Sequence, residues 1–167
     1  MERIHDASGG QSRQATGAAA SNLDLYQVNC TFYDALGRDD DAYLAARAIQ
    51  CFLPGVPQVY YVGLLAGEND MALLARTGVG RDINRHHYTR EEIRAALQRP
   101  VVQALCELIR LRNTHPAFGG CFELLESPHA TLAMRWRAGA VALRLDVDLT
   151  QRRHRISEEH ADGECAG

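Results

Sequence analysis

The stretch from Gly55 to Gly63 reads G-V-P-Q-V-Y-Y-V-G. Residues 56–62 within it are mostly apolar, and they are rich in β-branched and aromatic side chains. A short continuous run of this kind, bounded by glycines, is typical of a strand buried on both faces of a parallel sheet. We therefore expect a strand over residues 56–62.

Helices are predicted on both sides of this strand. Residues 40–53 carry apolar side chains at helical spacing and begin with an acidic cluster, which favours the positive end of a helix dipole. A second helical layer is expected over residues 89–114, with Thr89 as its cap and an interruption at Pro100, where a fresh helix begins. Helix, buried strand, loop and helix in this order predict an α/β fold.

The periodicity changes towards the end of the chain. From Cys121 onward, residues 122–125, 131–136 and 140–145 are expected to form three short strands joined by turns, as the start of a small β domain. Residues 150–167 have almost no apolar content. We expect them to be a disordered or mis-framed tail.

Composition narrows the class of protein. The chain has 167 residues, 46% hydrophobic residues and a formal net charge of −3. These values fit a soluble globular domain and argue against nucleic-acid binding, which usually needs a basic surface. No apolar run has membrane-spanning length and residues 1–22 read as a flexible polar leader rather than a signal segment, so we expect no membrane contact and a cytoplasmic location. The five cysteines lack C-x-x-C spacing, which argues against a disulfide framework or zinc site.

Two polar segments lie on either side of the predicted strand. Ser21–Asn29 reads S-N-L-D-L-Y-Q-V-N, and Gly80–Tyr88 reads G-R-D-I-N-R-H-H-Y. Strand, polar loop and helix is the layout of a barrel whose loops hold a ligand. From the residues alone, a surface salt bridge is the simpler interpretation of Arg81. The adjacent His86 and His87 have no third ligand at suitable spacing, so loop packing and hydrogen bonding are expected there rather than a metal site.

Several of these segments closely resemble sucrose phosphorylases of the α-amylase superfamily. The resemblance rests on residues 22–29, 55–67, 68–70 and 80–88, which occur in the same order in that family, and it extends over about residues 10–120. It implies a (β/α)8 barrel whose site lies at the C-terminal ends of the strands.

The resemblance also implies how the chain is organised. The predicted fold is α/β: the C-terminal portion of a (β/α)8 TIM barrel, followed by the start of a small all-β domain. Residues 1–118 would be the barrel part, from the loop after strand seven through helix seven and strand eight to helix eight. Residues 119–149 would begin the β domain, and residues 150–167 would be the tail.

The activity implied by the resemblance is retaining glucosyl transfer. Sucrose and inorganic phosphate would give α-glucose 1-phosphate and fructose by a two-carboxylate scheme, with phosphate in place of water and without cofactor or metal. The nucleophile and the acid/base precede the matched segment in this family, so we expect no catalytic residue in this chain. We also expect the 167-residue fragment alone to be poorly folded and inactive.

Five residues are matched to substrate-binding positions of the family. Arg81 corresponds to an arginine that hydrogen-bonds the glucosyl ring, a task suited to a rigid fork of donors. Asp24, Leu25, Tyr26 and Gln27 correspond to a mobile acceptor-site loop. The Asp24 carboxylate can accept from fructose hydroxyls but repels phosphate, whereas Tyr26 offers a hydroxyl donor and Gln27 can both donate and accept.

Alternatives remain open at this point. Phosphorylases of glucosylglycerate and of sucrose 6'-phosphate share much of the same frame, although the intact L-D-L-Y-Q favours sucrose. A non-catalytic carbohydrate-binding or interaction module is an alternative of another class, and it would require the chain to fold alone. Relatives include dimers, so a homodimer of the full-length enzyme also stays open.

Overall fold

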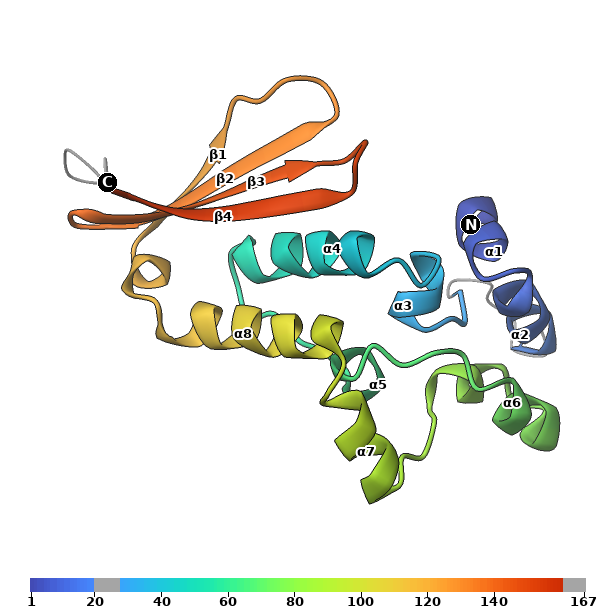
Figure 1. Cartoon of the computed structure of the whole chain (residues 1–167). Helices are drawn as coiled ribbons and strands as arrows, with labels where there is room; N and C mark the ends of the chain where they lie inside the picture. The colour runs from blue at the N-terminus through green and yellow to red at the C-terminus, as the bar shows by residue number, and fades with distance from the viewer. Residues whose placement is uncertain (20–27, 161–167) are drawn as a thin grey trace. The chain divides into compact units, whose positions relative to one another are not determined.

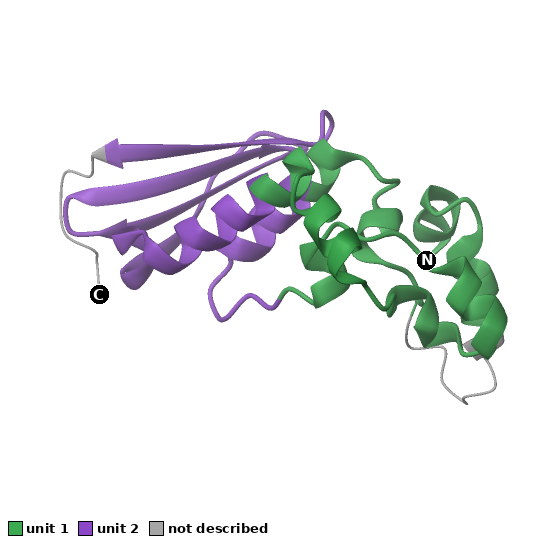
Figure 2. Ribbon diagram, turned by 60° about the horizontal axis from the view of Figure 1, so that its bottom comes forward, with its two compact units in different colours: residues 1–43, 59–103 green, residues 44–58, 104–167 purple. Residues whose placement is uncertain are grey.

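The computed structural model describes residues 1–19 and 28–160 (Figure 1). The chain divides into two compact units, shown in green and purple in Figure 2. Unit 1 comprises residues 1–43 and 59–103, and unit 2 comprises residues 44–58 and 104–167. The division falls within helices α4 and α8, so each of these helices contributes residues to both units.

Unit 1 is built from short helices. Its elements are α1 (Glu2–Ala7), α2 (Gln11–Ala19), α3 (Phe32–Ala35), the start of α4 (Asp40–Phe52), α5 (Tyr61–Leu64), α6 (Met71–Thr77), η1 (Gly80–Asn84), α7 (Arg90–Ala96) and the start of α8 (Pro100–Thr114).

The first two helices correct the expectation of a flexible leader, which is wrong for residues 2–19. Polar side chains there are buried rather than solvated. His5 Nδ1 lies 2.7 Å from Ser12 Oγ, and Ser8 Oγ donates to Ser12 Oγ at 2.9 Å. These hydrogen bonds satisfy groups whose burial would otherwise be costly, so a small, polar sequence still packs.

The strand expected over residues 56–62 is absent from the described structure. Residues 56–60 have no regular structure, and α5 begins at Tyr61. A strand is defined by its partners, and the four-stranded sheet of the described residues does not include this segment. Tyr60 keeps an extended backbone (φ −67°, ψ 147°) but has no ladder to join.

The helices predicted after it are confirmed. Thr89 caps α7 with a complete capping box, because its side chain accepts from the Glu92 amide and the Glu92 carboxylate accepts from the Thr89 amide. The interruption at Pro100 is also confirmed, since α8 begins at that residue. Helix α4 matches the prediction for residues 40–53 to within one residue.

Unit 2 contains an antiparallel sheet of order β1-β2-β3-β4. Its strands are β1 (Cys121–Leu125), β2 (Thr131–Ala138), β3 (Val141–Asp148) and β4 (Arg153–His160), and η2 (Pro116–Gly119) precedes them. Trp136, opposite Leu143, is buried at 7% exposure and donates from Nε1 to the Phe52 carbonyl at 2.6 Å. The three predicted strands are confirmed, and a fourth is added.

The fourth strand corrects the expectation of a disordered or mis-framed tail, which is wrong for residues 153–160. Ile156 is the only large apolar residue in β4, and it pairs with Leu145 of β3. The strand is otherwise polar, but it gains a full backbone ladder with β3, and Glu159 forms an ion pair with Arg144 at 3.7 Å. Cross-strand pairs of this kind support a strand that low apolar content alone would not predict.

Candidate functional site

Arg81 lies on the short helix η1, and its side chain is exposed. The helix is anchored by Ile83, which is fully buried against Leu74 and Ala15. The Asp70 amide also donates to the Ile83 carbonyl at 2.7 Å. The anchoring fixes the backbone from which the exposed Arg81 side chain extends.

The other four predicted site residues, Asp24 to Gln27, lie outside the described residues. The segment that follows them is described, and it is bonded to the helix that carries Arg81. Asn84 Nδ2 of η1 donates to the Cys30 carbonyl at 3.4 Å. The structure therefore brings the region just after Gln27 beside η1, but it does not test where Asp24–Gln27 themselves lie.

A buried polar cluster connects these segments. Asp34 is 1% exposed, and its carboxylate accepts from the Thr31 hydroxyl at 2.9 Å, the Asn69 amide at 2.7 Å and Arg38 Nε at 2.8 Å. Arg38 also pairs with Glu68 at 2.5 Å. Burial opposes the charge on Arg38, but the hydrogen bond and charge of Asp34, with the charge of Glu68, outweigh it and raise the pKa of the guanidinium. The cluster keeps a buried carboxylate fully paired, which is the condition for tolerating it.

Cys30 lies at the edge of this cluster. Burial raises the pKa of its thiol to about 11, in spite of a hydrogen bond from Asn69. A thiol with such a pKa is protonated at neutral pH and is a poor nucleophile. Cys30 therefore acts as a packing residue of unit 1.

His86 bridges two acidic side chains. Its Nδ1 lies 2.6 Å from Asp70 Oδ2, and its Nε2 lies 3.3 Å from Glu92 Oε1. The hydrogen bond to Asp70 raises the pKa of His86, burial opposes the rise, and Glu92 adds to it. Since Asp70 caps α6 and Glu92 belongs to the capping box of α7, the imidazole ties together the starts of both helices.

The hydrogen bonding expected at His86 is present. Both ring nitrogens already face carboxylates. Among the residues that the structure describes, no group of three or more His, Cys, Asp or Glu side chains is placed to hold a metal ion. His87 is exposed.

Aromatic side chains lie next to this bridge. The Tyr61 hydroxyl donates to the His86 carbonyl at 2.9 Å, and the Tyr61 and Tyr88 rings meet edge to face with centroids 6.2 Å apart. Tyr60 packs against Tyr61 at 4.5 Å, and the two are 55% and 40% exposed.

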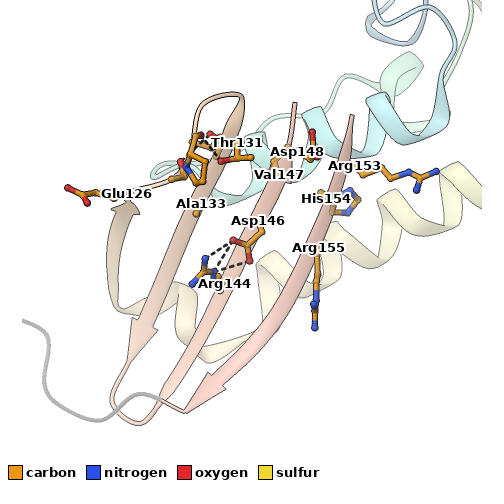
Figure 3. Close-up of a pocket in the computed structure, with 13 residues that line it drawn as sticks. Glu126, Thr131, Ala133, Arg144, Asp146, Val147, Asp148, Arg153, His154 and Arg155 are labelled. Atoms are coloured by element: carbon orange, nitrogen blue, oxygen red, sulfur yellow. Dashed lines mark hydrogen bonds and ion pairs between the residues drawn. The ribbon is translucent and has the colours of Figure 1, made fainter. Parts of the chain in front are cut away.

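Unit 2 contains a cavity of about 370 Å³ at the ends of its strands (Figure 3). Arg144 and Asp146, two residues apart on β3, form an ion pair in its wall, with Arg144 Nη2 2.8 Å and Nε 2.9 Å from the two carboxylate oxygens. Arg153 and Arg155 of β4 also line it. Because its cations are mixed with carboxylates, and because no predicted site residue lines it, it does not contribute to the candidate site.

The chain is similar to several phosphorylases, although no protein-family model matches it. Over 151 residues it is 62% identical to the sucrose phosphorylase of Agrobacterium vitis, which covers 90% of this chain and 31% of that protein. Over 125 residues it is 58% identical to the glucosylglycerol phosphorylase of Marinobacter adhaerens, and this match covers 75% of this chain and 26% of that protein. The solved structure of sucrose 6F-phosphate phosphorylase from Thermoanaerobacter thermosaccharolyticum has a TM-score of 0.79 at 40% identity and covers 91% of this chain and 34% of that one.

The chain is homologous to the C-terminal part of sucrose phosphorylases. It spans about a third of the length of the relatives it matches. The structural match confirms the predicted fold, namely the C-terminal portion of the barrel enzyme followed by a small all-β domain. Every helix in the described ranges is too short or too polar to cross a lipid bilayer.

The Asp34 cluster was not predicted, and neither were the two carboxylate partners of His86. The first joins residues up to 58 positions apart, as in the hydrogen bond from Asn69 to Gln11. Residues 68–70 are a polar run between two apolar stretches. Such a run could have indicated the cluster, because polar residues between apolar segments often supply helix caps and buried hydrogen bonds. The bridge was signalled by Glu92, which lies six residues after His86 at the start of a predicted helix.

Proposed function

We propose that this chain is the C-terminal part of a retaining glucosyl-transferring phosphorylase, which converts sucrose and inorganic phosphate to α-glucose 1-phosphate and fructose. The observation that carries the proposal is the 62% identity to a sucrose phosphorylase over 151 residues. A sucrose phosphorylase of Bifidobacterium adolescentis is also 58% identical over 137 residues. The chain contains both L-D-L-Y-Q and G-R-D-I-N-R, on which the resemblance to that family rests.

In this proposal Arg81 binds the glucosyl ring, and Asp24, Leu25, Tyr26 and Gln27 form the acceptor loop. The exposed guanidinium on a buried anchor supports the first role. The hydrogen bond between Asn84 and Cys30 supports convergence of the two segments. The nucleophile and acid/base would come from residues outside this chain.

The remaining features of the proposed enzyme follow its family. Residues 1–118 complete the barrel and residues 119–149 begin the β domain, to which the structure adds β4. The full-length enzyme is cytoplasmic and homodimeric, uses no cofactor, and binds neither nucleic acid nor membranes. The 167-residue chain alone is inactive because it carries no catalytic carboxylates.

A chimera tests the proposal. The matched residues of this chain would replace the corresponding residues of the A. vitis enzyme, and glucose 1-phosphate release would be measured with sucrose and with sucrose 6'-phosphate. Turnover of sucrose at a rate near that of the A. vitis parent is the expected result. A chimera that folds, measured by its thermal transition, but releases no glucose 1-phosphate from sucrose would refute the proposal.

A second candidate is the phosphorolysis of glucosylglycerol, because the enzyme of M. adhaerens is 58% identical over 125 residues. Glucosylglycerate is less favoured, since the glucosylglycerate phosphorylase of Escherichia coli is 35% identical over 56% of the chain. Assaying the same chimera with both substrates would rank them. A free-standing carbohydrate-binding module predicts instead that the isolated chain folds and binds sucrose in calorimetric titration.

A further inference from the structure

Arg81 lies within a segment of the chain that closes on itself. Asp70 starts helix α6, and the chain runs through α6 and η1 and then returns to Asp70 at Ile83 and His86. We propose that Asp70 and His86 are positioning residues for Arg81, and that the bond between them holds the backbone of η1 so that the guanidinium keeps one placement at the glucosyl ring. The inference rests on the proposed function, and it assigns roles to two residues outside the predicted site.

Asp70 holds this segment with three of its atoms. Its amide donates to the Ile83 carbonyl at 2.7 Å, and its Oδ2 lies 2.6 Å from His86 Nδ1. Its Oδ1 accepts from the Leu73 amide at 2.7 Å and so caps α6. One residue therefore joins the beginning of α6 to two points on the chain that follows Arg81.

The His86 end of the segment has further support. Glu92 Oε1 lies 3.3 Å from His86 Nε2, and the Tyr61 hydroxyl donates to the His86 carbonyl at 2.9 Å. The Glu92 carboxylate is itself held, because its Oε2 accepts from the Thr89 amide at 2.7 Å. The side chains of His86 and Asp70 are 30% and 16% exposed, so water and salt screen the bond between them less than they screen a surface ion pair.

The other end of η1 is held by the end of α6. The Gly78 amide donates to the Leu74 carbonyl at 2.9 Å, and Gly78 has a φ of 68°, the left-handed conformation in which glycine commonly ends a helix. Leu74 also packs in the core cluster with Ile83. Arg81 thus lies between a helix end and the Asp70 contacts, and its backbone is fixed on both sides while its side chain stays exposed.

The bond between Asp70 and His86 can be removed without removing the rest of this frame. The hydrogen bond to Ile83 comes from the backbone of Asp70, so it does not depend on either side chain. Loss of the imidazole would release the chain after Ile83, and a group displaced by about 1 Å can lower a rate by about 100-fold. The loss should therefore appear as weaker transition-state binding through Arg81.

A double-mutant cycle in the chimera described above separates positioning from general stability, with each rate measured well below the thermal midpoint of the variant. His86→Ala should lower kcat/KM for sucrose about tenfold when Arg81 is present. In the Arg81→Ala background there is no guanidinium to misplace, so the same change should lower kcat/KM less than about twofold. His129→Ala, at an exposed position of unit 2, is the matched control and should change neither value.

Two further variants assign the effect to the bond itself. In His86→Asn the side-chain amide nitrogen takes the place of Nδ1 and can donate to Asp70, so kcat/KM should stay within about threefold of the parent value. Asp70→Ser keeps a residue that caps helices well but is too short to reach His86, so kcat/KM should fall about tenfold, as in His86→Ala. If His86→Ala does not fold, Asp70→Ser takes its place in the cycle.

The outcomes separate this inference from the proposed function. Equal losses with and without the Arg81 guanidinium would overturn the positioning role while leaving the proposed function intact. A His86→Asn variant as impaired as His86→Ala would also overturn it. An unmodified chimera that folds but releases no glucose 1-phosphate from sucrose would refute the proposed function, and the role at the glucosyl ring with it.

Discussion

Substitution of Gly67 by alanine should destabilise the protein through a steric clash inside unit 1. A Cβ atom at this position would lie 2.0 Å from the Tyr88 hydroxyl oxygen, 2.7 Å from Val62 Cγ1 and 3.0 Å from the Val62 carbonyl oxygen. The Tyr88 side chain can rotate away, but the Val62 backbone cannot move without shifting α5. Overpacking of this kind costs about 1–3 kcal/mol.

The assay is the thermal midpoint of the chimera, followed by a signal from unit 1 such as tyrosine fluorescence. A cost of about 2 kcal/mol corresponds to a fall of roughly 4–8 °C if the affected domain has about 150–250 residues. Gly119→Ala is the matched control, because a Cβ there would meet nothing within 4 Å. It should leave the midpoint unchanged.

A double substitution separates the two parts of the clash. Tyr88→Phe removes the hydroxyl oxygen, which is the nearest atom, and leaves Val62 in place. The pair Gly67→Ala with Tyr88→Phe should therefore recover part of the lost stability, but not all of it. Equal midpoints for Gly67→Ala and Gly119→Ala, or full recovery in the pair, would refute the reasoning.

Three further predictions concern charged groups, each measured in the chimera. The pKa of His86 is raised above its ordinary value of 6.5, so its stabilisation is complete below that value and is lost as pH rises through the higher folded pKa. The thermal midpoint should therefore fall as pH rises through that pKa. The substitution His86→Gln should abolish this pH-dependent fall, whereas His129→Gln, at an exposed position, should leave it in place. Asp34→Asn should lower stability by about 1–3 kcal/mol because the buried amide cannot accept from all three donors of the native carboxylate; an unchanged midpoint would contradict this. Arg81→Lys should reduce kcat/KM for sucrose about 10- to 100-fold by losing the guanidinium fork, and an equal loss in the exposed Arg94→Lys would contradict it.

The parts of the fold that were predictable are local ones. Thr89 and Glu92 lie three residues apart, so the capping box of α7 can be read directly from the sequence. The alternating pattern of β2 and β3 likewise reflects the burial of one face of each strand. In both cases the interactions that define the element lie within it or in its neighbour along the chain.

The parts that were not predictable depend on distant partners. Residues 56–62 have the composition of a buried strand, but a strand also needs an adjacent one, and no described strand lies beside them. Helix α2 is stabilised by side chains such as Asn29 and Asn69, and no periodicity within residues 1–22 reveals such bonds. Strand β4 was missed for the same reason, since its ladder with β3 compensates for its polar side chains.

The candidate site divides in the same way. Arg81 could be proposed because it lies in a polar segment that matches a family motif. Its fixed backbone could not be derived, because the anchor depends on Ile83 packing against Leu74 and on a hydrogen bond from Asp70. The positions of Asp24–Gln27 stay a prediction.

The buried polar cluster of unit 1 has a physical consequence for the rigidity of the segments that it joins. Apolar packing tolerates small sliding motions, because its energy depends weakly on direction. The bonds of Asp34 and Asn69 are directional, and each has only one geometry in which all of its partners are satisfied. The cluster therefore fixes the segments that carry Asp34 and Asn69 relative to each other more strictly than aliphatic packing of the same volume would.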